Sequence, residues 1–291
     1  MKALLALTPR EAVLEGTADF VVNLADLPSM TEEEARDFLD SNVLTSGMEL
    51  LLQQSFARMA GEKSASGIYK LSESMGGGKT QSMIVAGILA KYPKLASVVG
   101  FSKTLPKAKP DVTASFSGRA TDQKVWVSIG KQLVVDFPTD RAPSEAEWRD
   151  VLKNRNALIL LDEMAFYLVH AASQGTKDEG TRAATLASIA LTTLFGAVRD
   201  YKECARCVIV ISDLQKDWEQ GAEELAKILR SNEVLGGTLQ SVNNEMSKGA
   251  VTIAPVDNQK DELYAILRKR LFKDIAVNDS EKKAIADAYI A

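Results

Sequence analysis

Two short clusters in this sequence have the residue types and spacing needed for chemistry on a phosphate group. The first is Gly76-Gly77-Gly78-Lys79-Thr80, which lies between an apolar run and a stretch with helical character. Glycines let the backbone curl around an anion with its N–H groups inward, the Lys can reach the β- and γ-phosphates of a nucleotide, and the Thr hydroxyl faces Mg²⁺. The segment is a candidate phosphate-binding loop, with Met75 and Gln81 as further candidate contacts at its ends.

The loop departs from the strict GxxxxGK[ST] pattern at its first position, where Glu73 replaces Gly. The form xxxGxGKT also occurs in helicase-like and some AAA+-type ATPases. Because the three glycines already supply the tight part of the loop, we expect Glu73 to point outward.

The second cluster is Asp162-Glu163, which directly follows the apolar run Ala157 to Leu161. A carboxylate at the end of a buried strand is the Walker B arrangement. It predicts Asp162 as a metal ligand beside Thr80, and Glu163 as the base for a water that attacks the γ-phosphorus. The two motifs together predict a site for ATP and Mg²⁺.

Other polar residues are weaker candidates for the same site. Ser212 follows the next apolar run and holds the sensor position of AAA+-like ATPases, although Ser-Asp after a strand is also an ordinary helix cap. An arginine finger could come from Arg199, Arg206 or Arg230, although an arginine in such a position is more often a surface ion-pair residue. We favour Arg230 because it follows the sensor strand.

A fold must bring these residues together. From residue 67 onward, apolar runs alternate with helical stretches along the chain, and this alternation predicts a parallel sheet covered on both faces. The expected strands are Gly67 to Leu71, either Ser97 to Phe101 or Val112 to Phe116, Ala157 to Leu161, Cys207 to Ile211 and Ala250 to Ile253. The expected helices are Gln81 to Lys91, Gln123 to Asp136, Ser144 to Leu152, Gly180 to Tyr201 and Asp217 to Leu229. The fold class is a three-layer α/β nucleotide-binding core.

Three regions follow from this pattern: an N-terminal helical segment (1–62), the core (63–258) and the start of a helical lid (259–291). Thr31 and Thr45 are expected to begin two helices of the first region. We expect Ser102 to Pro110 and Gly175 to Gly180 to form exposed loops.

The composition is that of an ordinary globular protein, since 46% hydrophobic and 25% charged residues are enough for a sizeable core. A formal net charge of −4 argues against a surface dominated by phosphate-backbone binding. No run approaches the roughly 18 to 20 apolar residues of a membrane span and no targeting segment is evident, so we expect a cytoplasmic protein.

The two cysteines, Cys204 and Cys207, have a spacing that suits a redox dithiol or half of a zinc site. His170 is the only histidine and cannot complete a zinc site with two thiolates alone. Because the pair leads into an apolar run, a buried structural role is favoured.

Several segments together resemble the prokaryotic AAA+-type ATPases catalogued as domain of unknown function family 499. The segments that carry the resemblance are Pro9 to Thr17, Glu73 to Gln81, Phe116 to Arg119, Leu160 to Tyr167, Val210 to Leu214 and Leu267 to Phe272. The resemblance implies a P-loop NTPase core with strand order 5-1-4-3-2, a helical lid from near Asp261, and proteins longer than this chain. Family members carry a GGGKT loop and commonly have His where this chain has Gln81.

By analogy with related AAA+ proteins, Arg10, Glu11 and Val13 become candidate contacts to the adenine. The resemblance implies an ATP-hydrolysing motor or switch subunit of an anti-phage defence or restriction-like system. Its partners would be further copies of the chain or a larger complex, with a DNA methyltransferase or nuclease as candidate members. DNA contact stays open, and no membrane is expected.

Two alternatives to this function stay open. One is a nucleotide-dependent binding or assembly module with little hydrolysis, favoured by an incomplete lid. The other is a nucleic-acid helicase, which has less support because Asp162-Glu163 is followed by Met-Ala and no second helicase domain follows.

Overall fold

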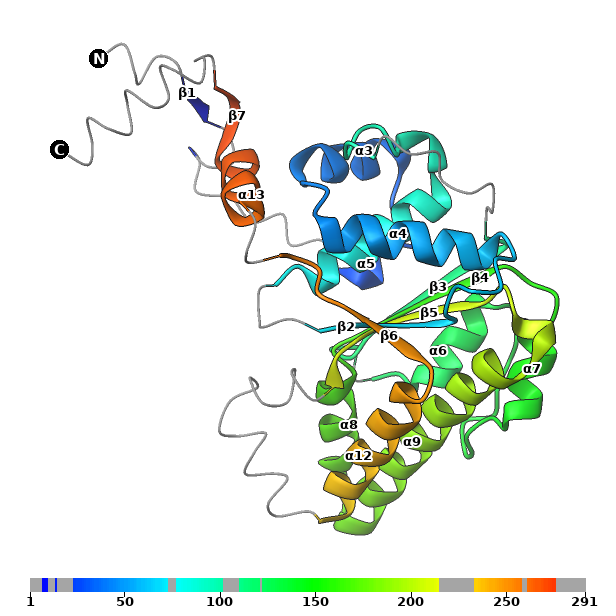
Figure 1. Ribbon diagram of the computed structural model, residues 1–291. Coiled ribbons are helices and arrows are strands. Elements are labelled where there is room, and N and C mark those ends of the chain that lie inside the picture. The colour runs from blue at the N-terminus through cyan, green and yellow to red at the C-terminus, as the bar shows by residue number, and fades with distance from the viewer. Residues whose placement is uncertain are drawn as a thin grey trace.

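The computed structural model describes residues 7–9, 14, 23–72, 77–101, 110–120, 122–214, 233–257 and 261–275. Its centre is a five-stranded parallel sheet with helices on both faces, as expected for a three-layer α/β fold (Figure 1). The strands lie in the order β3-β4-β5-β2-β6. Their bounds are β2 (Ile68–Leu71), β3 (Val112–Ser117), β4 (Ala157–Asp162), β5 (Val208–Ser212) and β6 (Ala250–Ile253).

The strands alternate their side chains between two separate hydrophobic clusters. In β4, Leu158 and Leu160 belong to one cluster, whereas Ala157, Ile159 and Leu161 belong to the other. The same alternation runs through β5. Both faces of the sheet are therefore buried, which explains the unbroken apolar runs of these strands in the sequence.

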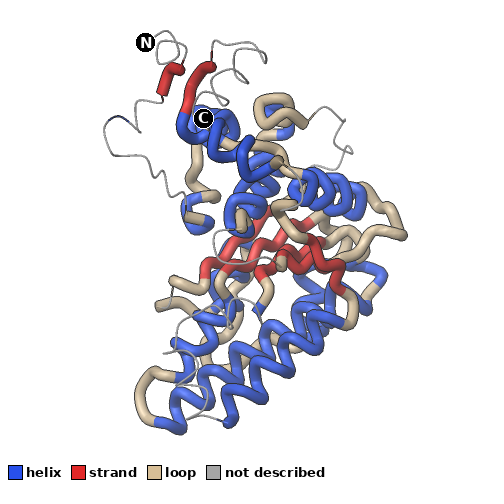
Figure 2. The backbone as a smooth tube through the Cα atoms, turned by 60° about the vertical axis from the view of Figure 1, so that its left-hand side comes forward, coloured by secondary structure: helices blue, strands red, loops and turns tan. Residues whose placement is uncertain are grey.

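Each cluster is completed by its own layer of helices, which lie above and below the sheet in Figure 1 and as blue tubes on either side of the red strands in Figure 2. The upper layer contains η1 (Leu24–Asp26), α3 (Glu32–Ser41), α4 (Ser46–Met59), α5 (Lys79–Lys91) and η2 (Pro93–Leu95). The lower layer contains α6 (Val125–Gln132), α7 (Glu145–Leu152), α8 (Met164–Ala172), α9 (Lys177–Asp200), η3 (Lys202–Cys204) and α12 (Glu233–Ser247). The N-terminal helices thus form part of the upper layer.

The long helix α9 begins earlier than the sequence analysis predicted. Thr176 accepts the N–H of Glu179, and the Glu179 carboxylate accepts the N–H of Thr176 at 2.7 Å, so the two residues form a capping box. The prediction of a loop over Gly175 to Gly180 is therefore wrong from Lys177 onward, because this cap satisfies the first N–H groups of the helix. Thr31 begins α3 with the same kind of cap, as predicted.

The edge strand β3 is protected by a side chain from α6. The Gln132 amide accepts the backbone N–H of Ser115 at 2.9 Å and donates to the Ser115 carbonyl at 2.8 Å, as a neighbouring strand would do. An edge whose hydrogen bonds are satisfied in this way is a poor template for pairing with another chain.

Several predicted element bounds need correction. Of the two alternatives for the second strand, Val112 to Phe116 is confirmed, and Ser97 to Phe101 forms turns. The helix predicted over Gln123 to Asp136 spans only Val125–Gln132, because the chain turns at Val134 with a left-handed φ of 62°.

Two helices of the lower layer were not predicted at all. The apolar run of α8 does not show a helical period. In α12, a pair of glycines lowers the helix propensity of a segment whose Leu239, Val242 and Met246 nevertheless repeat at helical spacing and are buried. The helix expected over Asp217 to Leu229 lies outside the described residues.

The lid region combines a helix with an unexpected strand. The predicted helix from Asp261 is present as α13 (Glu262–Leu271), which has no buried side chain. The next residues form β7 (Phe272–Ile275), which pairs antiparallel with β1 (Leu7–Pro9). Figure 1 shows this pair beside α13, away from the main sheet. The two ends of the described chain therefore meet in a small sheet of their own.

Within the described residues, α9 alone is long and apolar enough to pass a membrane-span test of length and composition. More than half of its apolar window, 56%, is buried inside the protein. The helix packs against α8, α7 and α12.

Candidate functional site

The described part of the candidate phosphate-binding loop leads directly into helix α5. Gly78 has φ 78° and ψ 13°, a left-handed conformation that a side chain would strain, and it immediately precedes the first helical residue, Lys79. Ser82 donates both its N–H and its hydroxyl to the Gly78 carbonyl, each at 2.9 Å. The N–H groups in the first turn of a helix have no partner within the helix and favour an anion.

Three polar residues end neighbouring strands at the same edge of the sheet. Asp162 pairs in register with Ser117 of β3, and Ser212 follows the residue of β5 that pairs with Leu161. The alternation of the strands places all three side chains on the α5 face. Their exposed fractions are 5% for Ser117, 3% for Asp162 and 0% for Ser212, so they form a row of buried oxygen atoms under the start of α5.

One hydrogen bond joins the candidate phosphate-binding loop to this row. The Thr80 hydroxyl donates to Oδ2 of Asp162 at 2.5 Å. The sequence analysis placed these two residues together as metal ligands, and the structure brings them into contact across 82 residues of chain. A hydroxyl and a carboxylate oxygen that meet in one partly buried place are ligand types that suit Mg²⁺.

Glu163 makes the turn from β4 into α8 with its backbone in the left-handed region, at φ 53° and ψ 35°. Its N–H lies 3.0 Å from Oδ1 of Asp162 and 3.0 Å from the Ser212 hydroxyl oxygen, and it donates to both. Ser212 therefore supports the position of Glu163 through the backbone. This contact gives the predicted sensor residue a structural role at the site.

The Glu163 side chain is held by a residue to which the sequence analysis assigned no role. Nε of Arg119 donates to both carboxylate oxygens at 2.8 Å. The Arg119 guanidinium also lies over the ring of Phe166, 5.8 Å from its centroid. The segment Phe116 to Arg119 entered the resemblance only as a sequence match, and its spacing gave no signal of this contact.

Gly118 makes the contact between the two strand ends possible. Its N–H donates to the Asp162 carbonyl at 2.8 Å, and a Cβ at this position would lie 2.0 Å from the Glu163 carbonyl oxygen. Any side chain here would force apart the turns that carry Arg119 and Glu163.

A buried ion pair lies beside the strand ends that carry Ser117, Asp162 and Ser212. It is on the other face of the sheet, away from α5. Lys70 of β2 lies 3.4 Å from Asp213, and their side chains are only 17% and 6% exposed. The Asp213 N–H also donates to the Leu71 carbonyl at 2.8 Å. These contacts connect the end of β5 to β2, the strand that leads into the candidate phosphate-binding loop.

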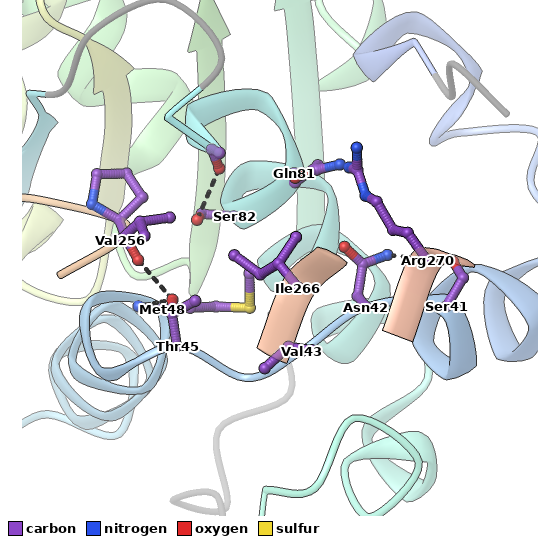
Figure 3. Close-up of a pocket in the computed structure, with 12 residues that line it drawn as sticks. Ser41, Asn42, Val43, Thr45, Met48, Gln81, Ser82, Val256, Ile266 and Arg270 are labelled. Atoms are coloured by element: carbon purple, nitrogen blue, oxygen red, sulfur yellow. Dashed lines mark hydrogen bonds between the residues drawn. The ribbon is translucent and has the colours of Figure 1, made fainter. Parts of the chain in front are cut away.

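A narrow pocket adjoins the loop on the α4 side (Figure 3). Its walls come from the loop before α4, from the start of α5 and from α13, whose Arg270 side chain extends toward Gln81 in the figure. The pocket also includes Gly78 and Asn42. Its free volume of about 10 Å³ is that of roughly one water molecule.

Two of the three arginine candidates are described, and neither lies at this site. Arg199 forms ion pairs with Asp200 and Glu245 at 2.5 and 2.6 Å, and it lies against Gly249 just before β6 begins. Arg206 precedes β5 and lies near Gly61. Both are thus at the amino edge of the sheet, opposite the row, and neither serves this site within one chain. Arg10, Val13, Glu73, Met75, Gly76 and Arg230 lie outside the described residues.

Comparisons with known proteins found no relative: no family model, no curated protein and no solved structure matches the chain.

Proposed function

We propose that this protein is a P-loop ATPase of the AAA+-like kind, which binds ATP with Mg²⁺ and hydrolyses it. The observation that carries the proposal is the contact between Thr80 and Asp162, which joins the two motifs that ATP hydrolysis requires. The strand order supports it, since the sheet reads 5-1-4-3-2 when its strands are counted along the chain from β2.

The start of α5 is suited to hold the phosphates. Lys79 and the N–H groups of the first helical turn would face the β- and γ-phosphates, since both favour negative charge. Thr80 and Asp162 would hold Mg²⁺, which when bound neutralises charge on the phosphate oxygens. Both residues offer hard oxygen atoms, and Asp162 is buried on the α5 face of the sheet, so the pair fits that ion.

Glu163 is the residue for activation of the attacking water. Its carboxylate extends from the same strand end as Asp162, and a carboxylate base beside the γ-phosphate is what the reaction needs. Ser212 would act as a positioning residue, because its hydroxyl fixes the Glu163 backbone at 3.0 Å.

The pocket between α4 and α13 is the proposed place of the nucleobase, because it begins at Gly78 where the phosphate site ends. A free volume of about 10 Å³ is too small for a base, so α13 would have to move outward on binding. α13 can move at little cost in hydrophobic burial, since none of its side chains is buried.

A second function, a nucleotide-dependent switch with little hydrolysis, is favoured by the contact between Arg119 and Glu163. Both oxygens of the Glu163 carboxylate accept a hydrogen bond from Arg119 at 2.8 Å. While this pair is formed, the carboxylate is not available to take a proton from the attacking water. In that case ATP would bind and change the position of α13 without rapid turnover.

The cellular setting is a further part of the proposal and depends on the family resemblance alone. We propose a cytoplasmic subunit of a prokaryotic defence system that assembles with copies of itself or with a larger complex. In such an assembly a neighbouring copy would offer Arg230 to the site.

Phosphate release with ATP and Mg²⁺ tests the two functions. The protein and its Glu163→Gln variant are compared, with Glu33→Gln on the exposed side of α3 as the matched control. An ATPase predicts release by the protein and by the control, and loss of at least about 100-fold with Glu163→Gln. Equal inactivity of all three, with ATP still bound, would support the switch.

A further inference from the structure

The CxxC turn lies far from the proposed nucleotide site. It connects α9 to β5 at the amino edge of the sheet, whereas the row of polar residues ends the strands at the carboxyl edge. Cys204 ends η3 and Cys207 precedes β5. Both cysteines are reduced and 0% exposed, as the favoured sequence interpretation predicted.

The turn holds the two thiols side by side. The Cys207 N–H donates to the Cys204 carbonyl at 2.9 Å, which closes a tight turn of four residues. Such a turn brings the first and last Cα atoms within about 7 Å, and a disulfide needs about 4.4 to 6.8 Å. Held this close, Cys207 keeps its proton and stabilises the ionised form of Cys204, which lowers the pKa of Cys204 and raises that of Cys207.

Arg58, a half-buried residue of α4, acts electrostatically on both thiols. Arg58 donates to the carbonyls of Ala65 and Val198, its Nε has no hydrogen-bond partner, and within the described residues it forms no ion pair. A cation without a carboxylate partner stabilises a thiolate nearby. The other groups that act on Cys204 are Glu203 beside it and Arg149 of α7.

The two cysteines also differ in what holds them. Sγ of Cys207 lies 3.5 Å from the carbonyl oxygens of Leu152 and Arg155 and donates toward them, which keeps its proton in place. When Cys204 is ionised, Cys207 turns this one proton toward the Cys204 sulfur instead, which lowers the pKa of Cys204. This asymmetry assigns Cys204 as the attacking thiol and Cys207 as the resolving thiol.

We propose that Cys204 and Cys207 form a redox-active dithiol that exchanges with low-molecular-weight disulfides. The Cys204 thiolate attacks one sulfur of the disulfide, which forms a mixed disulfide and releases one thiolate. Cys207 then gives up its proton and attacks Sγ of Cys204, so the second small thiolate leaves and the Cys204–Cys207 bond remains. The protein loses two electrons and two protons, and the small disulfide is reduced to two thiols.

A reagent reaches the pair only when the turn opens. The opening is a local one, because Glu203, Ala205 and Arg206 are exposed and η3 is three residues long. Local opening of a short surface element costs less than global unfolding. The proposal therefore predicts oxidation under native conditions, more slowly than for an exposed dithiol.

The test uses oxidised glutathione and intact-mass measurement on the folded protein, with the chain's two cysteines as its only thiols. We expect the loss of two hydrogens in the protein, and a lasting single glutathione adduct in Cys207→Ser. We expect adduct formation at least about 10-fold slower in Cys204→Ser, because Cys207 remains a thiol. Thermal unfolding of each variant establishes that it is folded.

Two results would overturn the proposal: oxidation only in denaturant, or equal adduct rates in the two variants. Both readouts are independent of ATP, so they do not depend on the proposed function. Arg206→Ala is the matched control, because it removes an exposed charge from the same turn and is expected to leave the ratio of the two rates unchanged.

Discussion

Arg119 holds the carboxylate of Glu163 through a single nitrogen, with Nε 2.8 Å from both oxygens. The guanidinium is largely exposed, at 68% of its side chain, and lies over Phe166, itself 43% exposed. The contact is thus at the surface of the site, where an ion pair contributes about 1 kcal/mol or less. An interaction of that size can be broken by a small change at the site.

If this pair restrains Glu163, then Arg119→Ala raises the rate of ATP hydrolysis. A restraint of about 1 kcal/mol corresponds to roughly a fivefold increase in the steady-state rate of phosphate release. Arg141→Ala is the control, since it removes an exposed arginine that pairs with Glu147 far from the site. A fall in rate for Arg119→Ala would instead make the arginine a participant in hydrolysis.

Thr80→Val removes the hydroxyl that joins the loop to Asp162. We expect the Mg²⁺ dependence of ATP binding to weaken by at least about tenfold, because one of two oxygen ligands is lost. The free energy of unfolding should also fall, by about 1 to 3 kcal/mol, since a buried carboxylate loses a hydrogen bond. Titration with Mg²⁺ and urea unfolding measure the two effects.

The matched control for that variant is Thr185→Val, in which the hydroxyl bonds the Thr181 carbonyl on the exposed side of α9. Thr185→Val should change neither the Mg²⁺ dependence of ATP binding nor the free energy of unfolding measurably. Unchanged Mg²⁺ dependence in Thr80→Val would show that this hydroxyl is not a ligand.

Gly118→Ala tests the close approach of the two strand ends. Its Cβ would meet the Glu163 carbonyl oxygen at 2.0 Å, so we expect destabilisation by about 2 kcal/mol or more. Gly236→Ala in α12 is the control, because a Cβ there meets nothing within 4 Å. Removing a glycine from a helix should stabilise the protein by about 0.5 to 1 kcal/mol. Equal melting temperatures for the two variants would contradict this account.

The N-terminal cap of α7 gives a prediction about pH. Hydrogen bonds from Arg141 and then from Ser144 lower the pKa of Glu147 from 4.5 to about 2. A carboxylate whose pKa is lower in the folded state stabilises it above the unfolded pKa, and this contribution is lost as the pH falls through the folded pKa. Glu147→Gln should therefore be less stable than the protein above about pH 4.5, and the difference should vanish toward pH 2.

Urea unfolding of both proteins between these pH values measures that difference. Asp122→Asn, which removes a carboxylate from the exposed turn before α6, is the control. A gap that stays constant across the pH range would place the effect of Glu147 in packing rather than in its charge.

The strands and the two motifs were predictable because each signal is local. Unbroken apolar runs ended by Asp162-Glu163 and by Ser212 specify buried parallel strands and what stands at their carboxyl ends. Arg119 was not predictable in this way. Its partner Glu163 lies 44 residues away in the sequence. The contact between them depends on the register between β3 and β4, which cannot be predicted from a single sequence.

Other misses have equally specific causes. The start of α9 was placed too late because Gly175 and Gly180 suggested a loop, whereas the spacing of Thr176 and Glu179 is that of a capping box. The pairing of β1 with β7 joins segments about as far apart as the chain allows, and each strand is too short to give a periodic pattern.

The central claim is that Lys79, Thr80 and Asp162 form an ATP site, and it is tested most directly by a titration of the protein with a fluorescent ATP analogue in the presence of Mg²⁺. The account predicts saturable binding by the protein, weakened at least about tenfold in Lys79→Ala and unchanged in Lys153→Ala, an exposed lysine after α7. Equal affinity in all three folded proteins, or no binding by any of them, would contradict it.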